Sequence, residues 1–344
     1  MSLSTPPLLP SGLMDVLPPL AAAEFRLIHH FLKTFMAFDY APVIPPLAEY
    51  AASLLAGQGK ATSHHVFRLN DPLAPQQLGI RADITGQVAR IASHALAAAP
   101  RPLRLCYAGY TLRTAPEALK TRRQHTQVGI ERFGPASANA TAEVLAIATH
   151  ALAVCGVEGV TIDLHYPSAM EALLVAQPPH THARIRDAVR MKDVAELRRL
   201  GAADAAAIIE CTGDAATSLA ALHALALPAL APALAAVEQL VAALRTQQIA
   251  ATLSLDLLDL SGYGYYTGVG YAMYWNQTRI EAGRGGCYRT ERGEEAVGFT
   301  LYINELLDHL PAEASAPRQT IPYGTPTSVA AALHAQGVVT VFGE

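Results

Sequence analysis

The feature that most constrains the fold is a pair of apolar segments separated by a polar loop. Residues 104–112 (RLCYAGYTL) and 125–133 (HTQVGIERF) have the composition of β-strands, whereas residues 114–123 are polar and show no alternating pattern. Consecutive strands usually lie side by side, and two strands joined by a loop without a helix pair antiparallel. The sequence therefore predicts a central antiparallel hairpin with a long loop.

Helices and further strands are predicted around this hairpin. The spacing of apolar residues predicts helices over 21–38, 85–98 and 142–154, with Thr85 as the N-cap of the second helix. Short strands are expected at residues 41–47, 65–69, 77–81, 160–164, 253–259 and 268–275, and from residue 279 onward. Strands that pair antiparallel, with helices between them, indicate an α+β fold.

The composition changes in two places along the chain. Residues 168–247 are rich in alanine and leucine with helical spacing, which predicts an inserted helical subdomain at about 168–250. Residues 314–317 are typical of a linker, and a strand–helix–strand pattern follows from residue 321. We therefore expect a main domain over 1–318, which contains the insertion, and a short C-terminal tail over 319–344.

Charge and cysteine content exclude some functional classes. The net charge is −4 and only 16% of residues are charged, which disfavours a dedicated nucleic-acid-binding protein. The four cysteines show no C-x-x-C spacing, so no metal site and no cofactor are predicted. Such sparse cysteines are typical of a reducing cytoplasm. Residues 218–237 lack charged side chains, but Pro228 and Pro232 interrupt them, so no membrane span is expected.

Four stretches resemble the histidyl-tRNA synthetase family. They are residues 112–134 (LRTAPEALKTRRQHTQVGIERFG), 79–85 (GIRADIT), 262–268 (GYGYYTG) and 296–307 (AVGFTLYINELL). The resemblance implies a class II aminoacyl-tRNA synthetase fold, in which an antiparallel sheet is flanked by helices. It also implies that the chain has no anticodon-binding domain, because few residues follow the last of these stretches.

The resemblance implies an amino-acid pocket and assigns residues to it. Asp83 would hold the α-amino group, Arg113 would bind the carboxylate, and Gln127 and Glu131 would line the histidine pocket. Tyr265 and Tyr266 would form a wall against the imidazole. Simpler interpretations stay open at this point: Asp83 as a helix cap, Gln127 and Glu131 on a solvent-exposed sheet face, and the two tyrosines as structural residues.

The chain departs from the synthetase pattern where the enzyme binds ATP. Ser261 stands where the family has an arginine before its glycine-rich signature, and Cys287 replaces the arginine of Gly-Gly-Arg-Tyr. Tyr302 and Glu305 replace a glycine and an arginine that contact the nucleotide. A glutamate in place of that arginine reverses a charge that faces an anionic nucleotide, so synthetase-like use of ATP is not expected and no catalytic residue is assigned.

This combination is similar to the regulatory subunits of ATP phosphoribosyltransferase. The resemblance implies a cytoplasmic, non-catalytic protein that pairs with a short-form catalytic subunit in the first step of histidine biosynthesis. It further implies dimers within a hetero-octamer of four regulatory and four catalytic chains, with L-histidine as the feedback effector. Two alternatives stay open: a small enzyme that adenylates an amino acid without recognising tRNA, and a module that senses uncharged tRNA.

Overall fold

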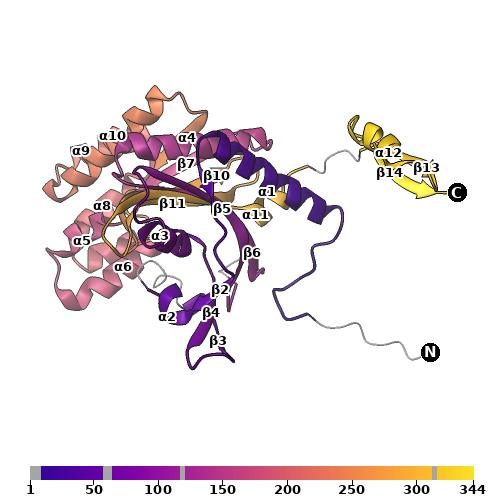
Figure 1. Ribbon diagram of the computed structural model, residues 1–344. Helices are drawn as coiled ribbons and strands as arrows, with labels where there is room; N and C mark the ends of the chain where they lie inside the picture. Colours follow the sequence, from indigo (N-terminus) through magenta and orange to yellow (C-terminus); the bar gives the residue numbers. More distant parts are fainter. Residues whose placement is uncertain (1–8, 57–63, 117–120, 312–315) are drawn as a thin grey trace, which may run out of the picture. The chain divides into compact units, whose positions relative to one another are not determined.

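The computed structural model describes residues 9–56, 64–116, 121–311 and 316–344 (Figure 1). The chain divides into two compact units, Met1–His309 and Leu310–Glu344. The sequence pattern placed this boundary later, at residue 318. Ala314 and Ser315 of the expected linker lie outside the described residues.

The first unit is built on a nine-stranded sheet with the order β1-β5-β6-β12-β11-β10-β7-β9-β8. Its strands are β1 (Ala41–Pro42), β5 (Leu103–Leu112), β6 (Gln124–Phe133), β7 (Val160–His165), β8 (Gly213–Asp214), β9 (Ala251–Leu255), β10 (Tyr266–Trp275), β11 (Ile280–Arg289) and β12 (Glu295–Tyr302). Neighbouring strands pair antiparallel except β1 with β5 and β7 with β9, which are parallel. The predicted class II synthetase-like α+β architecture is confirmed.

The predicted central hairpin is present. Strands β5 and β6 pair antiparallel over their whole length, from Leu103 opposite Phe133 to Leu112 opposite Gln124. The N–H of Arg113 donates to the carbonyl of Arg123 at 2.8 Å and extends the pairing into the loop. On β6, Gln127, Gly129 and Glu131 share one face, because side chains alternate along a strand.

Three long helices cover one face of this sheet: α1 (Leu20–Ala37), α4 (Ala138–Val154) and α10 (Ala231–Thr246) (Figure 1). Helix α1 buries Leu27, Phe31 and Phe35, one turn apart along its inner face. Phe35 meets Phe299 of β12 edge to face at 5.6 Å, which ties the helix layer to the middle of the sheet. The opposite face of the sheet is thereby left for the shorter elements and the site described below.

Those shorter elements are helix α3 (Thr85–Ser93) and a separate three-stranded antiparallel sheet of order β2-β4-β3. Its strands are β2 (Ala48–Tyr50), β3 (Phe67–Asn70) and β4 (Gln77–Ile80), and helix α2 (Ala51–Leu54) lies against them. Strand β4 leads through residues 81–84 directly into α3, so a carboxylate in this short connection lies at the start of a helix.

Several predicted boundaries were wrong for local reasons. Helix α3 ends at Ser93 rather than at residue 98, because Arg101 donates to the carbonyl of Ala92 in the last turn and to those of Leu96 and Ala99 beyond it. The N-cap of α3 is Ile84, not Thr85. Of the strand predicted at 41–47 only Ala41 and Pro42 pair, since the prolines that follow lack the N–H that a sheet needs.

Two further elements are shifted. Helix α4 begins at Ala138, four residues before the predicted start, because the side chain of Ser137 accepts a bond from the Ala140 N–H at 3.2 Å. Strand β9 occupies Ala251–Leu255 instead of residues 253–259. Beyond it, Asp256 and Leu257 still bond to the end of β7 by single backbone contacts.

The alanine-rich stretch forms a series of helices between β7 and the parallel strand β9. They are α5 (Ala169–Leu174), α6 (His182–Arg190), α7 (Val194–Arg199), α8 (Ala203–Glu210), α9 (Ala215–Ala224) and α10, with short 3-10 turns at Pro179–Thr181 and Pro228–Leu230. Strand β8 lies within this stretch and pairs with β9. The insertion is therefore tied to the edge of the main sheet.

One helical segment, Pro228–Thr246, is long and apolar enough to cross a membrane by length and composition. In the fold, α10 buries Val237, Leu240 and Leu244 and packs against α4 and β10. These contacts make α10 a core helix of the first unit.

The second unit consists of β13 (Arg318–Pro322), α12 (Thr327–His334) and β14 (Val339–Gly343). The two strands pair in parallel. This is the strand–helix–strand order predicted for the C-terminal residues.

Candidate functional site

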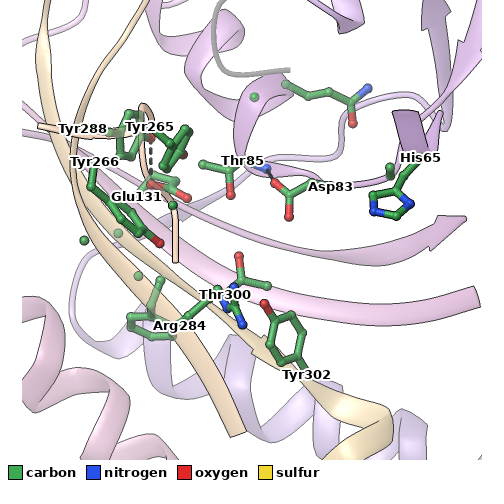
Figure 2. Close-up of a pocket in the computed structure, with 18 of the residues that line it drawn as sticks. His65, Asp83, Thr85, Glu131, Tyr265, Tyr266, Arg284, Tyr288, Thr300 and Tyr302 are labelled. Carbon is green, nitrogen blue, oxygen red and sulfur yellow. Dashed lines mark hydrogen bonds between the residues drawn. The ribbon is translucent and has the colours of Figure 1, made fainter. Parts of the chain in front are cut away.

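A cavity of about 260 Å³ lies on the sheet face opposite the long helices. Strands β6, β10, β11 and β12 form its floor. Residues just before β3 and at the start of α3 complete its wall. Figure 2 shows side chains from these elements converging on the same space. Of the six predicted site residues, the cavity is lined by Asp83, Arg113, Glu131, Tyr265 and Tyr266, whereas Gln127 is not among the lining residues.

Glu131 lies at the closed end of the cavity and is 1% exposed. The Tyr288 hydroxyl donates to its Oε2 at 2.8 Å. Gly298 faces Glu131 on the neighbouring strand, and a Cβ there would lie 2.0 Å from Oε2, so the glycine makes room for the carboxyl group. Burial raises the pKa of Glu131 to about 8, and the bond from Tyr288 opposes that shift. Near neutral pH the group therefore holds its proton.

Asp83 combines the two roles that the sequence left open. Its Oδ1 accepts from the Thr85 N–H at 2.9 Å at the start of α3, while Asp83 also lines the cavity. Its Oδ2 accepts from Nε2 of Gln127 at 3.0 Å. A carboxylate held at both oxygens has a fixed position from which it can bind an ammonium group.

Gln127 supports Asp83 rather than lining the cavity. Its amide is used on both sides, because Nε2 donates to Asp83 and Oε1 accepts from the Ile84 N–H at 3.2 Å. The side chain is 1% exposed, which contradicts the alternative of a solvent-exposed sheet face. Gln127 shares the face of Glu131 but is covered by the Asp83 connection, so a role in ligand binding stays a prediction that acts through Asp83.

Three tyrosine rings form one side of the cavity. Tyr265 stacks on Tyr288 with 5.3 Å between ring centroids and meets Tyr266 edge to face at 5.0 Å. Burial raises the pKa of both Tyr265 and Tyr288 far above the usual range, so their hydroxyls keep their protons. They can therefore donate hydrogen bonds to a ligand or to Glu131 at any physiological pH.

The ring of Tyr266 rests in a cradle of glycines. A Cβ at Gly262, Gly270 or Gly286 would lie 2.4, 2.9 or 2.8 Å from its ring atoms. Beneath it lies His165 at the end of β7, with 5.9 Å between the ring centroids. The three glycines are therefore needed for the close approach of a flat side chain to the sheet.

His165 is 1% exposed, and its ring packs beneath Tyr266. Burial lowers its pKa to about 4, an effect that Asp259 partly opposes. His165 is therefore a neutral packing residue under Tyr266 near neutral pH.

Arg284 is a cavity residue that the sequence analysis missed. Its Nε and Nη2 donate to the two oxygens of Glu281 at 2.6 and 2.8 Å, and its side chain is 39% exposed. Figure 2 shows it beside Tyr302, on the side of the cavity away from Tyr288. The alternation of β11 could have indicated it, because Arg284, Gly286 and Tyr288 share one strand face. His65, Thr85 and Thr300 also line the cavity and were not predicted.

The segment between β9 and β10 connects the cavity with the helical insertion. Ser261 is held by its N–H and hydroxyl on Oδ1 of Asp259, at 2.9 and 2.8 Å. Gly262 has a φ of 72°, which favours glycine, and its carbonyl accepts from the N–H groups of Tyr265 and Tyr266. The hydroxyl of Tyr263 donates to Glu171 of α5, and the guanidinium of Arg186 lies 5.8 Å from its ring.

The positions that depart from the synthetase pattern lie in different surroundings. Tyr302 lines the cavity, where the synthetase pattern has a glycine. Cys287 faces away from the cavity, and its Sγ lies 3.3 Å from Oγ1 of Thr141 on α4. Neither Ser261 nor Glu305 is among the lining residues. Within the part of the chain that the structure describes, no cluster of three or more His, Cys, Asp or Glu side chains could hold a metal ion.

The cavity is lined by both acidic and basic groups. Asp83 and the proton-bearing Glu131 line it together with Arg113 and Arg284, which supply positive charge. Opposite charges together with aromatic rings suit a small zwitterion with a planar polar side chain. The geometry therefore favours binding of an α-amino acid.

Comparisons with known proteins identify the family and the fold of the chain. A sequence model described as histidyl-tRNA synthetase matches residues 12–306. The ATP phosphoribosyltransferase regulatory subunit of Paramagnetospirillum magneticum is 42% identical over 98% of this chain and 90% of its own length. A crystal structure of an ATP phosphoribosyltransferase regulatory subunit/histidyl-tRNA synthetase from Bacillus halodurans has a TM-score of 0.83 and 22% identity, and covers 100% of this chain and 94% of that one.

A chain of the ATP phosphoribosyl transferase (HisG:HisZ) complex from Thermotoga maritima has the same fold, with a TM-score of 0.65 and 19% identity over 81% of this chain and 97% of that one. At such identities the solved structures establish the fold, while the curated relative establishes the family. The chain belongs to the ATP phosphoribosyltransferase regulatory subunits, which share the histidyl-tRNA synthetase fold.

Proposed function

We propose that this chain is the non-catalytic regulatory subunit of a cytoplasmic ATP phosphoribosyltransferase and binds L-histidine in the cavity between α3 and the central sheet. It acts with a short-form catalytic subunit in the first step of histidine biosynthesis. Two regulatory chains form a dimer, and four regulatory and four catalytic chains assemble into a hetero-octamer. Histidine bound to the regulatory chains inhibits the complex.

The observation that carries the proposal is the polar arrangement of the cavity. The α-ammonium group is bound by Asp83, whose orientation is fixed by Thr85 and Gln127. The imidazole lies against the tyrosine wall and hydrogen-bonds to Glu131. A buried carboxyl group with a pKa of about 8 can donate to a neutral imidazole or, once ionised, pair with an imidazolium.

The nucleotide side of the site supports a regulatory role over a synthetase role. Tyr302 lines the cavity at the position where the synthetase pattern has a glycine beside the adenine. A tyrosine ring there fills space that a nucleotide base would need. The fold and the amino-acid pocket are thus kept without the means of binding ATP in the synthetase manner.

Binding is tested by isothermal titration of the full chain with L-histidine. Glu131→Ala should weaken binding about tenfold or more, because a hydrogen bond to a chargeable partner is worth about 1.5–3 kcal/mol. The matched control is Glu158→Ala, which removes an exposed carboxylate. Unchanged histidine affinity in Glu131→Ala would reject the assignment of the pocket.

The regulatory role is tested by mixing the purified chain with a short-form catalytic subunit. We expect higher turnover of ATP and phosphoribosyl pyrophosphate than with the catalytic subunit alone, and inhibition of the mixture by histidine. Light scattering of the mixture should give the mass of four chains of each kind. No change in turnover at saturating regulatory chain would contradict the proposal.

The purified chain alone also tests the alternative that it is an enzyme that adenylates an amino acid. The chain alone, with histidine, ATP and labelled pyrophosphate, should show no pyrophosphate exchange. Exchange that depends on histidine would instead establish adenylation.

A further inference from the structure

We infer that Arg284 binds the free carboxylate of the amino acid in the cavity and thereby makes the site selective for amino acids whose carboxyl group is unmodified. This inference rests on the proposed function, because it specifies which part of the ligand the second arginine contacts. It concerns a residue on β11 that lies three positions before Cys287, the site at which the synthetase pattern has its arginine.

The first support is the fixed orientation of the guanidinium group. Glu281, three residues earlier on the same strand, accepts from Nε and Nη2 of Arg284 at 2.6 and 2.8 Å. This paired contact orients the planar group before any ligand enters, so less freedom is lost on binding. No hydrogen bond between Nη1 and another described residue is present, and 39% of the side chain is exposed where it lines the cavity.

The second support is the distribution of charge along the cavity. The carboxyl groups of Asp83 and Glu131 serve the ammonium and imidazole of the ligand, so its carboxylate must face the arginines. Burial raises the pKa of Tyr302, and Glu281 and Asp83 add to that rise, whereas Arg284 and, more weakly, Arg113 oppose it. Arg284 and Arg113 therefore contribute positive charge to the same region of the site.

The third support is what Tyr302 does to the adjoining space. It lies on β12 beside β11, close to Arg284, and lines the cavity (Figure 2). A carboxyl group that carries an ester or a phosphoryl substituent would place that substituent against the tyrosine ring. An ester would also lose the negative charge that pairs with the guanidinium. Tyr302 therefore excludes a substituent on the carboxyl group of the ligand, and Arg284 favours the negative charge of a free carboxylate.

The test compares L-histidine with L-histidinol, in which a hydroxymethyl group replaces the carboxylate, by isothermal titration of the full chain. Wild-type protein should prefer L-histidine by about 10–100-fold, the equivalent of one charge-assisted contact. In Arg284→Gln, affinity for L-histidine should fall by about tenfold or more, while affinity for L-histidinol stays unchanged. L-histidine methyl ester should bind the wild-type protein no better than L-histidinol.

The preference ratio separates a specific effect from a structural one, because a distorted pocket weakens both ligands. Arg289→Gln is the matched control. Arg289 lies on the same strand as Arg284 but outside the cavity, where it pairs with Glu295 of β12. Its substitution should leave the preference ratio unchanged. Arg284→Lys keeps the charge without the planar fork and should retain part of the preference. It also serves as the test variant if Arg284→Gln does not fold.

Three outcomes overturn the inference: equal wild-type affinities for L-histidine and L-histidinol, an Arg284→Gln variant that keeps the full preference, or one that loses both ligands equally. In each of these the wild-type chain still binds histidine, so the proposed function stands. A wild-type chain that binds neither ligand contradicts the proposed function itself and the inference with it.

Discussion

The hydroxyl of Tyr288 donates to Oε2 of Glu131 across 2.8 Å, and both side chains are buried. The two residues come from β11 and β6, which are separated in the sheet by β12. The pair therefore exists only when three strands are assembled in register. Burial keeps the proton on Glu131, and the bond from Tyr288 limits how far its pKa rises.

Glu131→Gln should reduce the loss of stability at alkaline pH. Because the pKa of Glu131 rises from 4.5 to about 8 on folding, the folded state holds a proton that the unfolded chain has released. The free energy of unfolding therefore falls as pH rises from about 4.5 to 8. Between about pH 6.5 and 9 this amounts to roughly 2 kcal/mol, which the variant should not lose. Urea unfolding of both proteins at these two pH values measures it.

Tyr288→Phe is the partner experiment. The bond from Tyr288 lowers the pKa of Glu131, so its removal should extend the pH range of the stability loss above pH 8. Identical pH dependence in wild type and Glu131→Gln would show that Glu131 is ionised in the folded chain, against this account.

His165→Leu should flatten the acid side of the stability profile. Burial lowers the pKa of His165 from 6.5 to about 4, so the unfolded chain takes up a proton that the folded chain does not. This group makes the free energy of unfolding fall as pH drops from about 6.5 to 4, and leucine removes that contribution. Chemical unfolding at about pH 6.5 and 4.5 measures the difference.

Gly270→Ala should weaken both the fold and histidine binding. The new Cβ would lie 2.3 Å from Nε2 of His165 and 2.9 Å from the ring of Tyr266, so one of these rings must move. Overpacking of this kind typically costs about 1–3 kcal/mol. Gly268→Ala on the same strand meets Cys287 at a milder 3.1 Å and should cost less. Thermal unfolding and histidine titration measure both variants, and an equal effect of the two substitutions would contradict the glycine cradle.

Gln127→Met should lower histidine affinity about tenfold, although Gln127 does not line the cavity. The substitution removes the donor to Asp83 and the acceptor of the Ile84 N–H, so Asp83 is no longer held for the ammonium group. Imidazole, which has no α-ammonium group, should bind the variant as it binds wild type. Gln124→Met, at an exposed position on the same strand, should change neither affinity. Equal loss of histidine and imidazole would indicate general damage to the pocket.

The sequence predicted those parts of the site that depend on one strand or one loop. The alternation of β6 put Glu131 on an inward face, and the tyrosine pair was recognisable from its own glycine-rich segment. The alternation of β11 could have put Arg284 on the face of Tyr288, but its closeness to Tyr302 required knowledge of which strand lies beside β12. Strand order depends on packing across the whole sheet, and a local pattern does not contain it.

Gln127 and the end of α3 also could not be predicted from the local sequence pattern. Gln127 shares a face with Glu131, yet only the path of the chain at Asp83 and Ile84 decides that it is covered. Residues 94–98 have the composition of a helix, but Arg101 binds the carbonyls at its end from outside the segment. In both cases a side chain distant in sequence overrides the local preference.

Tyr263 connects the segment before β10 with the helical insertion. Its side chain contacts Glu171 and Arg186 of the helical insertion, while two residues later Tyr265 faces the cavity. A single hydrogen-bonded turn at Gly262 joins the two tyrosines. The wall of the cavity and the contact with α5 and α6 therefore belong to one short segment of the chain. A substitution that reshapes this turn would alter the cavity and the anchoring of the insertion together.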